Sequence, residues 1–207
     1  MPFVTENKIV NVEAGNQTSV FRKTVLDSNY DKLRDFEFKV EENKKFKLNT
    51  KQSMEAERLI YNFLSSAEAW RNRWQKVFRK IRCLDEEEIM NKLEEEYNAN
   101  KIAFMSHLRN FVVHNDSPEL MFKINDGKRK IYIKKDYWLD KDVQNAEQNI
   151  DQNNRAKNND RAEKMSDFYR SQNDFIDILD LAKGYHQAIV ETDKMALREC
   201  KDLISEI

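Results

Sequence analysis

Apolar residues recur every three or four positions over two long stretches, from about Ser53 to Ile81 and from Ile89 to Val112. On an α-helix this spacing gathers them on one side, so it predicts a pair of helices with a shared core within residues 53–114. The carboxylates of residues 85–88 would stabilise the start of the second helix, and residues 98–100 would weaken it midway. We expect these apolar stripes to form the core or a subunit interface rather than a cofactor site.

The same helical spacing returns from Ala162 to Leu203 and predicts helices over residues 161–205. Gly184 would either break this region or allow a neighbouring side chain to pack closely. Residues 140–160 contain many Asn, Gln, Asp and Lys residues and few apolar ones. That composition predicts a mobile connector or a frayed helix.

Two stretches alternate apolar and polar residues instead. Residues 120–124 alternate, residues 125–127 (Asn-Asp-Gly) are typical of a tight turn, and Ile131 and Ile133 resume the pattern, so residues 119–134 are predicted to form a β-hairpin. Alternation from Phe36 to Leu48 predicts a second, looser hairpin within an N-terminal arm, residues 1–50. The earlier part of this arm would hold short strands or be mobile.

The amino-acid composition indicates the fold class. The chain of 207 residues has 35% charged residues but only three glycines and two prolines, which is typical of a single soluble, mainly α-helical domain. Cys83 and Cys200 lack metal-ligand spacing, so we expect no metal and reduced thiols in a cytoplasmic protein. No apolar run is long enough to predict a membrane span. Motifs typical of P-loop nucleotidases, serine hydrolases and zinc proteases are absent from the sequence.

Residues 108–118 contain the candidate chemistry. Asn110 and His114 lie one helical turn apart, and Arg109 flanks them. Pro118 disfavours helical geometry in the residue before it, and residues 115–117 (Asn-Asp-Ser) are typical of a turn, so the helix should end at about His114. A guanidinium can bind phosphate and an imidazole can transfer a proton. Alternatively, Arg109 forms a salt bridge and His114 caps the helix. His107, one turn before Asn110, is expected to be a bystander or, as the alternative, to shape the site.

This Arg-x4-His spacing resembles the motif of HEPN domains, which are small α-helical proteins that include many metal-independent endoribonucleases. Residues 108–114 resemble the Leu-Arg-Asn-Tyr-x-x-His block of a set of bacterial HEPN-like proteins. Residues 58–67 resemble the helix that precedes this block in those proteins, and Gly184-Tyr185-His186 with Val190 resembles their late helix. The resemblance covers roughly residues 36–200. It implies a single HEPN-like helical bundle with one or two small β-hairpins.

The resemblance also implies an activity of toxin–antitoxin or phage-defence type: cleavage of RNA by attack of a ribose 2′-OH, without metal or other cofactor. His114 would act as general base or acid, Arg109 would bind the phosphate, and Asn110 would orient either of them. A homodimer with a composite site is implied, together with a possible antitoxin or other regulatory partner. The alternative is a catalytically silent HEPN-fold dimer that acts as an interaction or regulatory module.

Two basic segments are candidates for RNA contact. One side of the first long helix carries cations without an acid among them, and the predicted hairpin carries more. The chain has a net charge of −1, so RNA affinity would depend on such local patches. The alternative is that both are ordinary solvated surfaces, the hairpin being a charged edge that resists strand addition. The candidate residues are Arg71, Arg73, Lys76, Arg79, Lys80, Lys128, Arg129 and Lys130.

Overall fold

The computed structural model describes residues 24–37, 50–81, 91, 97–114, 118–125, 128–135, 137–152 and 156–205. Within these ranges, side chains are described except for residues 73–81, 113–114, 125, 137–138, 149–152, 156–159 and 196–205. The described part is mainly helical with one small antiparallel sheet, which confirms the predicted fold class.

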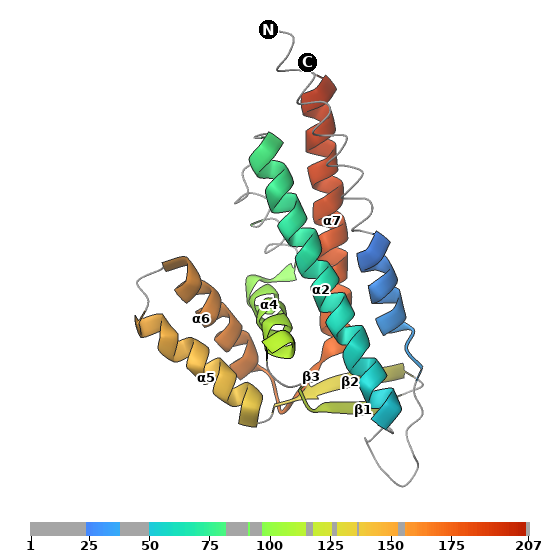
Figure 1. Ribbon diagram of the computed structural model, residues 1–207, viewed down its shortest axis with the longest axis vertical. Coiled ribbons are helices and arrows are strands. Elements are labelled where there is room, and N and C mark those ends of the chain that lie inside the picture. The colour runs from blue at the N-terminus through green and yellow to red at the C-terminus, as the bar shows by residue number, and fades with distance from the viewer. Residues whose placement is uncertain are drawn as a thin grey trace.

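Two long helices form the body of the bundle. Helix α2 (Thr50–Ile81) and helix α7 (Ile178–Ser205) contact each other, and the shorter helix α4 (Ala99–His114) packs against both. Figure 1 shows the sheet at one end of this bundle and the helices α5 and α6 beside α4. The predicted helix from about Ser53 to Ile81 is therefore confirmed, and it begins three residues earlier.

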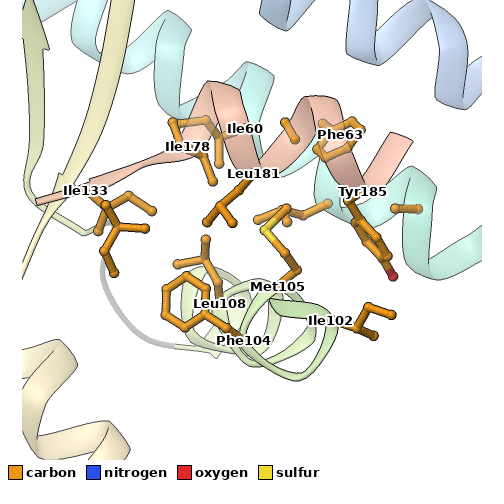
Figure 2. Packing of buried hydrophobic residues seen from close by; sticks show 14 of the residues in the cluster. Ile60, Phe63, Ile102, Phe104, Met105, Leu108, Ile133, Ile178, Leu181 and Tyr185 are labelled. Atoms are coloured by element: carbon orange, nitrogen blue, oxygen red, sulfur yellow. The ribbon is translucent and has the colours of Figure 1, made fainter. Parts of the chain in front are cut away.

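The core lies where α2, α4 and α7 meet. Phe63 of α2, Phe104 and Leu108 of α4 and Ile178 of α7 are fully buried, and Ile133 reaches the same cluster from the sheet. Figure 2 shows these side chains converging on the space between the helices. Phe63, Phe104 and Leu108 occupy positions of the two apolar stripes in the sequence, so these parts of the stripes are core, as expected.

Asn98 sets the start of α4. Its backbone φ of 85° lies in the left-handed region, which asparagine adopts more readily than most residues. Its side-chain oxygen accepts a hydrogen bond from the backbone N–H of Asn100, which satisfies one unpaired donor at the helix start. The helix ends at His114, four residues before Pro118, as the sequence predicts.

Tyr97, directly before this cap, fixes α4 against α7. Its hydroxyl donates a 2.6 Å hydrogen bond to the backbone oxygen of Leu181, and its ring stacks on Tyr185. Gly184 lies beneath the Tyr97 ring. The role of Gly184 is thus close packing within a continuous helix, one of the two alternatives that the sequence offered.

Helices α5 (Tyr137–Gln152) and α6 (Ala156–Ser171) replace the mobile connector that was one of the two alternatives for residues 140–160. Residues 140–152 and 156–160 are helical, and few apolar residues suffice in α5 because Leu139 and Val143 are spaced by one turn and are both buried. Polar contacts supply the rest of the pairing: the Glu147 carboxylate binds Arg170 at 2.7 Å, and Asp140 accepts a hydrogen bond from Tyr169.

The sheet contains the predicted hairpin and one strand that the sequence did not reveal. Strands β1 (Leu120–Asn125) and β2 (Lys128–Lys134) pair antiparallel, with Asn125 opposite Lys128, as the turn signal predicts. Strand β3 (Phe175–Asp177) pairs with β2 and divides the C-terminal helical region into α6 and α7. Asp177 then begins α7, because its carboxylate accepts hydrogen bonds from the backbone N–H groups of Leu179 and Asp180.

Residues 24–34 are helical, which corrects the expectation of strands or a mobile arm. Leu26, Tyr30 and Leu33 are buried at helical spacing and complete the core. The predicted hairpin from Phe36 to Leu48 falls mostly on residues 38–49, outside the described residues. Phe36 itself packs against the core.

Candidate functional site

Arg109 and Asn110 lie in the last two turns of α4 and contact each other. The Arg109 guanidinium donates a 2.9 Å hydrogen bond from Nη1 to the Asn110 side-chain oxygen. Arg109 is half-buried and its Nε atom is buried without a hydrogen-bond partner, whereas Asn110 is exposed. Because a guanidinium only donates hydrogen bonds, it fixes the amide with its oxygen toward Arg109. The Asn110 NH2 group is left to donate elsewhere.

Arg109 differs from five other arginines whose side chains are described. Each of those contacts a carboxylate: Arg34, Arg58, Arg71, Arg129 and Arg170. No described carboxylate contacts Arg109, and its partner is a neutral amide. A cation held in this way keeps its affinity for an external anion, since the strongest guanidinium partners are carboxylate and phosphate.

Asn110 also lines a cleft of about 180 Å³ between α4, α5 and α6. His107 and Arg161 contribute the other polar groups, and the remaining lining side chains are apolar (Ala103, Ala146, Ala162 and Met165). Asn110 and Arg161 are lining residues whose side chains carry N–H donors. The cleft therefore suits a small group rich in acceptors, such as part of a nucleotide.

His107 lies at the inner side of this cleft. Its Nε2 atom is 2.7 Å from an Asp142 carboxylate oxygen, although the N–H is not aimed at it, so the contact is electrostatic rather than a well-formed hydrogen bond. Burial lowers the pKa of His107, and the nearby Arg161 lowers it further, while Asp142 acts in the opposite direction. The buried imidazole consequently favours its neutral form. The sequence placed His107 one turn before Asn110, as a bystander or as a residue that shapes the site, and the cleft lining agrees with the second alternative.

This lowered pKa predicts that stability decreases in mild acid. The unfolded chain binds a proton at His107 near pH 6.5, whereas the folded chain resists it until a lower pH. The contribution of neutral His107 to the free energy of unfolding is therefore fully present above pH 6.5 and is lost as the pH falls toward the pKa of the folded state. Urea unfolding of wild type and His107→Gln, compared between pH ~7.5 and pH ~5.5, should show a smaller loss in the variant. An equal loss in both proteins would contradict the assignment.

His114 ends α4, one turn beyond Asn110 and two turns beyond His107, so the three positions lie along one side of the helix. The His114 side chain is outside the described part. The backbone thus brings position 114 into line with the cleft, and the assignment of His114 as acid or base stays a prediction.

The predicted RNA-contact residues fall into two separate groups. Arg71 is held by Glu68 at 2.8 Å and by Ser106 at 3.0 Å on the inner side of α2, and the side chains of Arg73, Lys76, Arg79 and Lys80 lie outside the description. On β2, Lys128 is exposed, Arg129 lies 3.6 Å from Glu37, and Lys130 pairs with Asp177. Lys128 and Lys130 point to one side of the sheet and Arg129 to the other.

Sequence reasoning missed Arg161, because the packing of α4 against α6 brings it to Asn110 across fifty intervening residues.

Among the described side chains, no group of three or more His, Cys, Asp or Glu residues is placed to hold a metal ion. No helix in the described residues is long and apolar enough to cross a bilayer. No family model, curated protein or solved structure matches this chain.

Proposed function

We propose that this protein is a metal-independent endoribonuclease whose site lies at the C-terminal end of α4. The observation that carries the proposal is the state of Arg109: a half-buried guanidinium that no described carboxylate contacts and that binds Asn110, a residue of the cleft lining. Phosphate is the ligand that such a guanidinium binds best. The Arg-x4-His resemblance supplies the reaction type.

In the proposed reaction His114 acts on the ribose and Arg109 on the phosphate. As general base, His114 takes the proton of the 2′-OH while that oxygen attacks the adjacent phosphorus. The bond from phosphorus to the 5′-oxygen breaks, and this oxygen leaves with a proton from a general acid. In a homodimer, His114 of the second copy would be that acid. Arg109 stabilises the charge that develops on the phosphate oxygens.

The basic residues and the partners complete the proposal. Lys128 and Lys130 would contact the RNA backbone, since phosphate contacts give affinity without sequence preference. Uncontrolled cleavage of cellular RNA would require a neutralising or regulatory protein, which fits a role in a toxin–antitoxin or phage-defence system.

The test is cleavage of defined single-stranded RNA in the presence of EDTA. We expect products that end in a 2′,3′-cyclic phosphate, because the 2′-oxygen is the nucleophile. RNA of the same sequence with 2′-O-methyl groups should stay intact, and so should RNA incubated with His114→Ala purified in parallel, which measures background nuclease. Equal cleavage of both substrates, or by both proteins, would refute the proposal.

A second outcome would favour the interaction module. If wild type leaves every RNA intact, and His114→Ala and Arg109→Ala lose dimerisation or thermal stability, then the motif holds the assembly together. Light scattering and thermal unfolding of the same preparations would detect this.

A further inference from the structure

The outer face of the sheet is distinct from its core face. In both strand pairs, residues opposite each other point to the same side. Phe122, Ile131, Ile133 and Ile176 share one side and are fully buried against the helices. The residues between them therefore form the outer face: Met121, Lys123, Lys128, Lys130, Tyr132, Lys134, Phe175 and Asp177.

Positive charge dominates this outer face. Lys130 pairs with Asp177, and Lys134 pairs with Glu119 at 2.9 Å. Lys123 and Lys128 are both exposed, and no described carboxylate contacts either of them. The four lysines and their two carboxylate partners give this face a net charge of two positive units, although the whole protein has a net charge of −1. A local patch of this kind attracts a polyanion where the whole molecule does not.

Aromatic rings lie among these lysines. Phe175 on β3 is 42% exposed, so a large part of its ring is open to solvent. Tyr132 on β2 meets it edge-on, with ring centroids 6.4 Å apart and an interplanar angle of 69°. The edge contact supports the Phe175 ring from one side and leaves the ring accessible. Lys134 lies directly opposite Phe175 in the strand pairing.

An exposed aromatic ring flanked by lysines on an antiparallel sheet can bind unpaired nucleotides. The bases of a single strand stack on the ring, and the lysines follow the phosphates. A duplex offers the phosphates but keeps its bases stacked on each other. The combination of ring and charge therefore favours single strands over duplexes.

We propose that the outer face of the β1–β2–β3 sheet binds single-stranded RNA, with a base stacked on Phe175 and the backbone along Lys123, Lys128 and Lys130. The choice of RNA rests on the proposed function. The position fits that function, because β1 begins six residues after His114 and so lies within about 20 Å of the end of α4 along an extended chain. Figure 1 shows the sheet at this end of the bundle.

The test separates binding from cleavage by using 2′-O-methyl RNA, which lacks the nucleophile of the proposed reaction. Fluorescence anisotropy would be measured with a labelled single strand of about ten nucleotides and with the duplex of the same sequence. We expect wild type to bind the single strand more tightly. Phe175→Ala should weaken binding of the single strand about tenfold and leave duplex binding unchanged.

Matched controls come from α2. Tyr61 is also 42% exposed, so Tyr61→Ala removes an equally exposed ring elsewhere and should leave RNA binding unchanged. Lys123→Gln should reduce the slope of log affinity against log salt by about 0.7, whereas Lys51→Gln, at another exposed lysine, should not.

Three results would overturn the proposal: wild-type affinity in Phe175→Ala, equal losses in Phe175→Ala and Tyr61→Ala, or duplex binding as tight as that of the single strand. None of them depends on cleavage. A protein that binds the 2′-O-methyl strand through Phe175 but leaves ordinary RNA intact would support this surface and refute the ribonuclease.

Discussion

Replacing Gly184 with alanine is expected to destabilise the protein by about 1–3 kcal/mol. In an open helix the same change stabilises by about 1 kcal/mol, because alanine is the better helix former. Here the new Cβ would lie 2.4 Å from Cε2 and 3.1 Å from Cδ2 of the Tyr97 ring. The Tyr97 ring cannot move away from this Cβ without losing contacts, since its hydroxyl donates to the Leu181 oxygen and its face stacks on Tyr185.

Urea unfolding of four proteins would test this: wild type, each single variant, and Gly184→Ala combined with Tyr97→Ala. Tyr97→Ala alone should destabilise, because it removes a buried ring. Within that background Gly184→Ala should turn neutral or stabilising, so that the two changes are far from additive. A stabilising Gly184→Ala in the wild-type background would mean that the ring moves aside without cost.

The elements that the sequence predicted well are those specified by local signals. Residues 50–81 carry an apolar stripe through several turns, and residues 125–127 carry the chemistry of a tight turn. The end of α4 at His114 agrees with two local signals, the turn-forming sequence Asn-Asp-Ser at 115–117 and Pro118 directly after it. In each case the physical cause lies inside the element itself, so the sequence is sufficient.

Strand β3 and helix α5 have no such signal. Three residues of β3 are too few for an alternating pattern, and they are extended because β2 offers an edge at which Tyr132 meets Asp177 and Ile133 meets Ile176. Helix α5 has few apolar positions and depends on α6 for burial and for the ion pair between Glu147 and Arg170. Both elements result from long-range packing, which one sequence does not display.

The candidate site divides in the same way. Arg109 and Asn110 are neighbours in sequence, and their hydrogen bond is local. Arg161 reaches the cleft and Asp142 reaches His107 only through the packing of α5 and α6, and Phe175 joins the lysines of the hairpin only through β3. The motif identified the candidate residues on α4, whereas the residues around them could be found only from the fold.

His114→Ala is expected to lower the rate of RNA cleavage by about 10²–10⁴-fold, the usual contribution of a general acid or base. Arg109→Ala should lower it by about 10²–10³-fold, because one preorganised donor to the developing charge is lost. Both effects should appear in kcat rather than in KM, since these groups act on the transition state.

Arg109→Lys separates charge from geometry. Lysine keeps the positive charge but lacks the planar fork that holds the Asn110 oxygen and two phosphate oxygens together. We therefore expect a rate between those of wild type and Arg109→Ala. If charge alone mattered, Arg109→Lys would match wild type, and Asn110 would have no orienting role.

Arg58→Ala is the matched control for these variants. Arg58 is an exposed arginine on α2 that pairs with Glu55 at 2.6 Å, and its removal should leave both cleavage and stability nearly unchanged, since exposed ion pairs contribute little. Single-turnover cleavage and thermal unfolding would be measured on every variant. If the cleavage rate falls no more in Arg109→Ala than in Arg58→Ala, Arg109 has no role in catalysis. If the cleavage rate of Arg109→Ala falls only in proportion to its fraction of folded protein, Arg109 contributes to stability and not to catalysis. Its buried Nε would then act through the packing of α4 and not by binding phosphate.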